Sequence, residues 1–287
     1  MRFSEKISES LKKAAIRLPD DVLSCIYQAK ETEELYPQDI HSQASLSVLN
    51  AILENLELAS SLSLPMCQDT GMFDVFVDLG RDCPLLPKQV ELSINEGCLN
   101  AVQEAFYRRS VVDEPVFSRK NTQNNLPPII WWNLVEGDSL SIKVLLKGFG
   151  SENCSSVRML NPTGGEQAVI DAVAEIVSLA GGKPCPPIFV GVGLGGTMER
   201  AAYLSKRALL RDASLDHGDV RYAKLEKSIL ERLQSLGIGS GGFGGRVTAL
   251  HVAIESEPTH IAGMPLAVSI NCWADRKVEI VWEGEDA

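Results

Sequence analysis

The chain lacks any run of about 18 consecutive apolar residues, the length that a membrane-spanning helix requires. It also lacks an apolar signal core, because its start, MRFSEKISESLKKAAIRL, has the pattern of a charged amphipathic helix. We therefore expect a cytoplasmic protein that does not bind a membrane, although amphipathic starts also occur in organellar transit segments. With 287 residues, the chain can bury a sizeable core without disulfide bonds.

The chain also has no excess of basic over acidic residues. The chain has 27 Lys and Arg residues against 38 Asp and Glu, a formal net charge of −11, whereas nucleic-acid binding relies on a basic field. We therefore expect no nucleic-acid partner. An anionic ligand would need a local basic cluster, and the densest basic neighbourhood consists of Arg108, Arg109, Arg119, Lys120 and Lys147. Guanidinium groups suit carboxylates, although a solvated surface is the ordinary role of any single member.

No Cys-x-x-Cys pair occurs, which argues against zinc ribbons and ferredoxin-type clusters. The seven cysteines are odd in number and widely spread, so we expect no disulfide framework. Three of them lie in loops: Cys67, Cys185 and Cys272. If these three thiolates held an iron–sulfur cluster, one iron would lack a protein ligand and would be open to a substrate hydroxyl. On spacing alone, three ordinary buried cysteines are the better interpretation.

Helical and strand-like patterns alternate along the chain, with no internal repeat or linker. Residues 1–64 have a helical pattern, 72–80 predict a strand, and 148–165 resemble a long loop. Further helical patterns cover 91–109, 166–180, 197–212 and 219–236, and strand-like runs are IIWWNLVEG, SLSIKVLLKG, IFVGVGLGG, TALHVAIES and LAVSINCWA. We expect an α+β fold, with a helical N-terminal region followed by a mixed sheet, in a single domain over residues 1–287.

Gly191, Gly193 and Gly196 match the dinucleotide-binding pattern G-x-G-x-x-G, and Asp212 follows 21 residues after Gly191. This pattern would indicate a Rossmann-type dehydrogenase if it opened a βαβ unit. Here Cys-Pro-Pro directly precedes the apolar run, and Asp212 follows a helical stretch. Glycines that pack a strand against a helix are the better interpretation.

Two polar residues have ordinary interpretations when taken alone. Asp69 precedes Thr-Gly, which is typical of a turn. His260 lies between Thr259 and Ile261 and would usually be a hydrogen-bonded core histidine. Neither residue identifies a function by itself.

Several blocks, taken together and in order, resemble the class I (iron–sulfur) fumarate hydratases. The resemblance is greatest to the separate α subunit of the two-chain form and to its relative, the L-tartrate dehydratase α subunit. It spans roughly residues 65–277, and the blocks are CQDTG, YRRSVV with SRKNT, KGFGSEN, CPPIFVGVGLGG, LGIGSGGFGG and HIAGMPLAVSINCWADRK.

The resemblance implies a 4Fe-4S cluster held by Cys67, Cys185 and Cys272, with substrate on the fourth iron. It implies that Asp69 and His260 are catalytic, with Asp69 a candidate for proton transfer. The residues implied to contact substrate are Gln68, Asp69, Arg108, Gly148, Gly150 and His260. This chain departs from the family in having Phe149 where a glycine is usual, and in the run Trp273-Ala274-Asp275 after Cys272; we expect Phe149 to reshape the pocket.

The implied reaction is the reversible hydration of fumarate to malate, with the dehydration of tartrate to oxaloacetate as the alternative. A non-catalytic scaffold subunit is a further alternative, against which the presence of all three cysteines and Asp69 argues. Single-chain members of the family continue into a second domain, whereas this sequence ends at VWEGEDA. We therefore expect a separate β subunit to complete the site, in an α2β2 heterotetramer.

Overall fold

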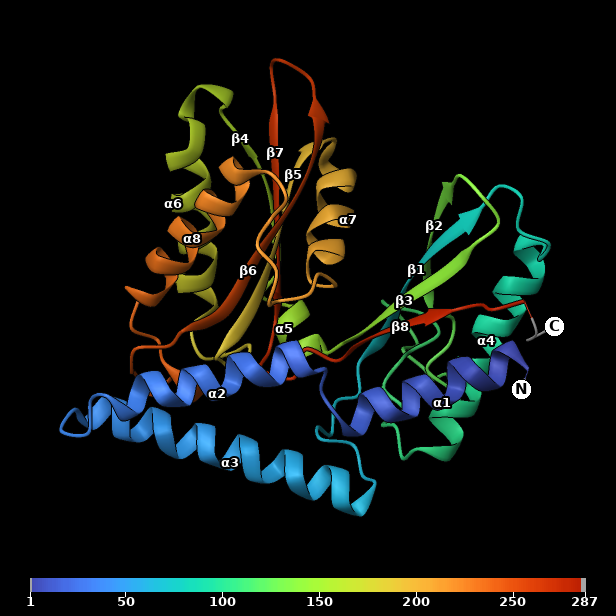
Figure 1. Cartoon of the computed structure of the whole chain (residues 1–287), viewed down its shortest axis with the longest axis horizontal. Helices are drawn as coiled ribbons and strands as arrows, with labels where there is room; N and C mark the ends of the chain where they lie inside the picture. Colours follow the sequence, from blue (N-terminus) through green and yellow to red (C-terminus); the bar gives the residue numbers. More distant parts are fainter. Residues whose placement is uncertain (1, 285–287) are drawn as a thin grey trace. The chain divides into compact units, whose positions relative to one another are not determined.

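The computed structural model describes residues 2–284 and divides the chain into two compact units. The first unit comprises the chain up to Pro19, Asn55–Phe149 and the segment from Arg276 onward. The second unit comprises Asp20–Glu54 and Gly150–Asp275. Helices and mixed sheets occur in both, which confirms the predicted α+β class (Figure 1). The single domain over 1–287 stays a prediction.

The first unit is built on a four-stranded sheet in the order β2-β1-β3-β8. β1 pairs with β2 in parallel and with β3 antiparallel, and β3 pairs with β8 antiparallel. The strands and the two main helices of this unit are α1 (Phe3–Ile16), β1 (Met72–Gly80), α4 (Pro87–Glu104), β2 (Ile129–Val135), β3 (Leu140–Lys147) and β8 (Lys277–Val281).

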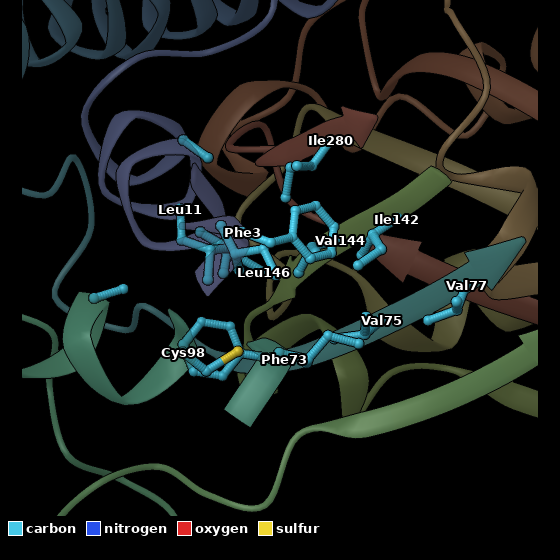
Figure 2. Close-up of a cluster of buried hydrophobic side chains, with 14 of the residues drawn as sticks. Phe3, Leu11, Phe73, Val75, Val77, Cys98, Ile142, Val144, Leu146 and Ile280 are labelled. Atoms are coloured by element: carbon cyan, nitrogen blue, oxygen red, sulfur yellow. The ribbon is translucent and has the colours of Figure 1, made fainter. Parts of the chain in front are cut away.

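The core of the first unit lies between this sheet and the helices α1 and α4. Side chains in a strand alternate between its two faces, so Phe73, Val75 and Val77 of β1 point to the same side. They are buried together with Phe3 of α1 and Cys98 of α4 (Figure 2). Burial of this apolar surface fixes β1, and therefore fixes the segment that immediately precedes it.

The second unit has its own four-stranded sheet, in the order β4-β7-β5-β6. β5 pairs with β6 in parallel and with β7 antiparallel, and β4 pairs with β7 antiparallel. Its elements are α2 (Asp20–Glu34), β4 (Ser156–Leu160), α6 (Gly165–Ala180), β5 (Ile188–Gly196), α7 (Met198–Ala208), α8 (Val220–Gln234), β6 (Ala249–Thr259) and β7 (Met264–Asn271), with short 3-10 turns at Pro162–Gly164 and Ser240–Gly242. Helices α3 (Ile40–Leu62) and α5 (Phe149–Glu152) have residues in both units.

The G-x-G-x-x-G glycines lie in β5, where they pack the strand against α7. A Cβ at Gly191 would come 2.0 Å from the Ser205 carbonyl oxygen, and one at Gly193 would come 2.0 Å from that of Ala201. The alternate β5 residues instead join the core formed with α6 and α8, the helices drawn on the other side of this sheet in Figure 1. Asp212 closes a turn by accepting the Ser214 N–H at 2.8 Å. These glycines therefore serve helix–strand packing, as the sequence indicated.

Helices α1, α2 and α3 lie within the predicted helical region 1–64. The expectation of an unbroken loop over 148–165 was wrong, because the segment contains α5 and β4. Within residues 2–284, β4 is a five-residue strand whose only partner is β7, which lies about 100 residues later in the chain. No local pattern can reveal such a pairing. Among residues 2–284, no helix is both long and apolar enough to cross a membrane.

Candidate functional site

The CQDTG segment forms a tight turn that presents the Asp69 carboxylate in the first unit. Asp69 Oδ1 accepts the Gly71 N–H at 3.1 Å, and Oδ2 accepts the Phe149 N–H at 2.9 Å. Gly71 has a φ of +82°, and a Cβ there would lie 2.5 Å from the Lys147 carbonyl group. Only glycine allows this approach. The turn and the end of β3 therefore fix Asp69 from both sides.

Gly148 lies between the Asp69 carboxylate and the Arg276 guanidinium. A Cβ added at Gly148 would be 3.5 Å from Asp69 Oδ2 and 3.7 Å from Arg276 Nη2. A side chain at position 148 would therefore fill the space beside the carboxylate. Lys147 is buried, and its Nζ donates to the Gly148 carbonyl oxygen at 3.3 Å.

Arg276 is a residue whose importance the sequence did not show. It is only 1% exposed, and its Nη2 donates to the Leu146 carbonyl oxygen at 3.5 Å. Its Nε and Nη1 are buried and have no hydrogen-bond partner among the described residues. Burying a guanidinium group costs free energy unless the group is paired and hydrogen-bonded. The available signal was its place at the end of the block HIAGMPLAVSINCWADRK, which carries part of the family resemblance.

Arg108 is exposed, but the chain on either side of it is anchored. The buried Tyr107 donates its hydroxyl to the Leu11 carbonyl oxygen at 2.7 Å and stacks on Phe73. Burial raises the pKa of Tyr107, and the charge of Arg276 opposes this effect. The Asn125 amide donates to the Arg108 carbonyl oxygen at 2.7 Å. The backbone of Arg108 is therefore fixed, while its guanidinium is free to reach a ligand.

Cys67 is half-buried and Gln68 is exposed, both in the first unit. The preceding residue, Met66, forms hydrogen bonds through both its backbone N–H and its carbonyl oxygen. Met66 donates its N–H to the Ala15 carbonyl oxygen at 2.9 Å, and its own carbonyl oxygen accepts the Asn55 amide at 2.8 Å. These bonds fix the entry to the turn that carries Cys67.

Cys185 is exposed on a turn of the second unit and has a φ of +55°, a left-handed conformation that is rare for residues other than glycine. Its N–H donates to the Gly182 carbonyl oxygen at 3.2 Å. The following Pro186 accepts the Gly241 N–H at 2.7 Å, and Ile188 begins β5.

Cys272 follows directly after β7 in a turn of the second unit that side chains close. The Asn271 amide donates to Asp275 Oδ1 at 2.6 Å, and the Ser151 hydroxyl lies 3.3 Å from Asn271 Oδ1. Cys272 is half-buried between these residues. Gly150, also in this unit, is exposed at the start of the short helix α5.

His260 is exposed in the hairpin turn between β6 and β7. Its Nδ1 accepts the Ala262 N–H at 3.2 Å, and its carbonyl oxygen accepts the Gly263 N–H at 2.9 Å. It is therefore not a core histidine. Phe149 is 47% exposed, and its backbone N–H donates to Asp69.

All seven cysteines are thiols, and none forms a disulfide. Cys98 is buried in the first core, where burial raises the pKa of its thiol and makes it unreactive. Cys25, Cys83 and Cys154 are half-buried. Cys67, Cys185 and Cys272 differ from Cys25 and Cys98 in lying in turns, outside regular elements.

The donor set of Cys67, Cys185 and Cys272 fits an iron–sulfur cluster chemically, because thiolates are the soft ligands that such clusters take. Cys67 belongs to the first unit and the other two to the second, so neither unit contains all three. Within the described part of the chain, no group of three or more His, Cys, Asp or Glu side chains is arranged to hold a single metal ion.

Comparison with known proteins identifies the family. The family model described as fumarate hydratase (Fumerase) matches residues 4–281. A Methanocaldococcus jannaschii protein named provisionally as an L(+)-tartrate dehydratase subunit alpha is 39% identical over 284 residues, which are 96% of each chain. The L(+)-tartrate dehydratase subunit alpha of Escherichia coli strain K12, and that of Shigella sonnei, are each 31% identical over 278 residues, 96% of this chain and 89% of theirs. The chain is therefore a hydro-lyase of the fumarate hydratase (Fumerase) family.

Proposed function

We propose that this chain is the α subunit of an iron–sulfur hydro-lyase that interconverts fumarate and malate. The observation that carries the proposal is the fixed Asp69 carboxylate, whose two oxygens accept backbone N–H groups while Gly148 leaves the space beside it without a side chain. The family model names fumarate hydratase. The relatives' names make the dehydration of L(+)-tartrate the second candidate.

Cys67, Cys185 and Cys272 would hold the 4Fe-4S cluster. When bound, such a cluster supplies one iron that lacks a protein ligand and acts as a Lewis acid toward the substrate hydroxyl. The three thiols suit this role because they lie in turns and remain accessible to some degree. The two units would then act as one hydro-lyase domain over residues 1–287, which the span of the family match supports.

Asp69 would transfer the proton. In the dehydration direction its carboxylate takes a proton from the carbon next to the hydroxyl-bearing carbon, and the C–H electron pair becomes the new C=C bond. The C–O bond breaks, the hydroxide takes up a proton from solvent and leaves as water, and Asp69 then returns its proton to solvent. A base with both oxygens already oriented by backbone donors needs little rearrangement to react.

Arg108 would bind a substrate carboxylate with two hydrogen bonds, which its planar guanidinium favours over the single charge of a lysine. Gln68 and His260 would supply further polar contacts, and His260 would serve in catalysis. Gly148 and Gly150 would leave room for the substrate. The buried guanidinium of Arg276 would add positive charge beside Gly148 and stabilise negative charge that develops on the substrate.

A β subunit would complete the site, since the relatives are named subunit alpha. We propose an α2β2 heterotetramer in the cytoplasm, by analogy with the symmetry of most oligomers. Anaerobic reconstitution with iron and sulfide, followed by titration of the co-encoded β chain, tests this proposal. Activity on fumarate, malate and both tartrates should be absent in the α chain alone and should saturate near one β chain per α chain.

Single replacements identify the cluster ligands. Cys67→Ser, Cys185→Ser and Cys272→Ser should each abolish cluster assembly, because two thiolates cannot hold the cluster against solvent. Cys83→Ser, which changes a half-buried cysteine packed against the first core, is the control and should keep the iron content of the wild type. Full iron and sulfide in one of the three variants would exclude that residue as a ligand, and substantial turnover by the α chain alone would refute the need for a partner.

A further inference from the structure

Glu33, in the last turn of α2, is a fully buried acidic residue that the proposed chemistry does not use. Its Oε1 accepts the Arg246 N–H at 2.7 Å, the Val247 N–H at 3.0 Å and the Ser45 hydroxyl at 2.9 Å. Its Oε2 has no hydrogen-bond partner in the described part of the chain. Burying a carboxyl group is costly. We therefore expect Glu33 to act mainly on the backbone whose N–H groups it accepts.

Arg246 and Val247, whose N–H groups Glu33 accepts, directly follow the glycine loop, residues 238–245, with the sequence IGSGGFGG. It is folded tightly on itself and against the helices. A Cβ at Gly239 would come 1.6 Å from the Gly244 carbonyl oxygen, and a Cβ at Gly245 would come 2.6 Å from Glu33 Oε1. The loop therefore has no room for side chains at these positions, and its glycines let Glu33 approach the backbone directly.

Ser45 of α3 links Glu33 to the middle of the glycine loop. Its hydroxyl donates to Glu33 Oε1 and lies 2.9 Å from Ser240 Oγ, and both serine side chains are fully buried. The Arg246 guanidinium does not compete for Glu33 in this arrangement, because it pairs with Asp39 at 3.1 Å. Ser45 thus holds the loop at Ser240, and Glu33 holds the backbone directly after its C-terminal end.

The glycine loop in turn holds the segment that follows Cys185. The Gly241 N–H donates to the Pro186 carbonyl oxygen at 2.7 Å, and the Ile188 N–H donates to the Thr248 carbonyl oxygen at 3.1 Å. The Gly242 and Gly182 backbones are also in contact, since a Cβ at Gly242 would come 2.9 Å from the Gly182 Cα. The turn that carries Cys185 therefore has the glycine loop on both sides.

We propose that Glu33 is a positioning residue for the cluster ligand Cys185, acting through the glycine loop. The role of Cys185 as a cluster ligand rests on the proposed function. The contacts that connect Glu33 to Cys185 through the glycine loop do not depend on a bound cluster. Residues 186–188 are bonded at one end to Gly241 and at the other to Thr248, which directly follows the Val247 N–H that Glu33 accepts. Without the Glu33 oxygen, both bonds would open more often, and Cys185 would lose its strained left-handed conformation more readily.

Amide hydrogen exchange of the metal-free chain tests the link directly. Glu33→Ala should speed exchange at the Gly241 and Ile188 amides about 10-fold or more, because the loop loses its buried acceptor. Glu33→Gln keeps one carbonyl oxygen for the same donors and should stay within about threefold of the wild type. Unchanged exchange at both amides in Glu33→Ala would overturn the proposal.

A matched control separates this effect from general destabilisation. Glu226 of α8 is another buried carboxylate of the second unit, and it accepts the Ile254 N–H at 2.8 Å and pairs with Arg211. Glu226→Ala should destabilise the unit but leave the Gly241 amide protected. If Glu33→Ala does not fold, Ser45→Ala carries the test, with faster exchange at Gly241 supporting the proposal and unchanged exchange overturning it.

Cluster retention provides the second measurement. After anaerobic reconstitution, iron release to a chelator should be about 10-fold faster from Glu33→Ala than from the wild type or Glu226→Ala. If the wild type takes up no cluster, the proposed function fails, while the exchange result still decides the positioning link. If the wild type holds its cluster and Glu33→Ala releases iron at the same rate, the proposed function stands and the role of Glu33 is refuted.

Discussion

Replacement of Asp69 by asparagine should affect stability and catalysis separately. The carboxylate offers one oxygen to the Gly71 N–H at 3.1 Å and the other to the Phe149 N–H at 2.9 Å. Asparagine has only one oxygen, so whichever way the amide turns, one backbone N–H faces an NH2 group. Asp69→Asn therefore removes a hydrogen bond as well as the proposed proton-transfer group.

The expected loss of stability follows from that single unpaired donor. A buried donor left without its acceptor costs about 1–3 kcal/mol. Because Asp69 is only half-buried, we expect a loss in the lower part of this range, about 1–2 kcal/mol. In a chain of this size such a change lowers Tm by about 2–8 °C. Because an amide cannot transfer the proton, turnover should fall by about 10²–10⁴-fold.

Urea unfolding of the metal-free chain measures the first effect, and turnover of the reconstituted complex with the β chain measures the second. Asp78→Asn is the matched control, because the Asp78 contact is a single bond from the Asn133 amide at 2.8 Å. An asparagine there keeps an oxygen for that bond, so the change should stay within about 0.5 kcal/mol. Equal stabilities of the two variants would refute the clamp on Asp69, and near-wild-type turnover by Asp69→Asn would refute its role in proton transfer.

Two further predictions concern the second unit. Gly193→Ala should cost about 3 kcal/mol or more in urea unfolding, because its Cβ would come 2.0 Å from the Ala201 carbonyl oxygen. Gly218→Ala, at a position with open space, should change stability by less than about 0.5 kcal/mol, and similar losses in both would contradict the packing of β5 on α7. Hydrogen bonds from the side chain and backbone N–H of Arg221 lower the pKa of Asp219 from its ordinary 3.8 to about 2. Asp219→Ala should therefore have a lower free energy of unfolding than the wild type above about pH 4. This difference should shrink as the pH falls toward 2, and a difference that stayed constant with pH would argue against the pairing of Asp219 with Arg221.

Periodic segments were predictable from the sequence because their signal is local. The strand over 72–80 and the helix from 166 to 180 match β1 and α6 to within one residue. Proline and glycine also marked turns correctly, as in CQDTG, where a glycine with positive φ follows the aspartate. Such features depend on neighbours within a few residues, so one sequence is enough to find them.

The strand β4 and the roles of Arg276 and Glu33 were not predictable for the opposite reason. β4 exists only because β7 pairs with it from about 100 residues away. Arg276 lies beside Gly148, and Glu33 accepts backbone donors more than 200 residues later in the chain. Both residues look in the sequence like ordinary surface charges, since nothing local shows that they are buried.

The sequence by itself determined the family motifs of this protein, the position of three cysteines in loops, the candidate base at Asp69 and the acidic net charge. Those properties follow from residue type and short-range order. Tertiary structure alone decided that the oxygens of Asp69 are held by Gly71 and Phe149, and that a buried acid holds the loop beside Cys185. Hydrogen bonds and burial depend on which distant segments come into contact. The packing of side chains within each core decides these contacts, and the local sequence pattern does not.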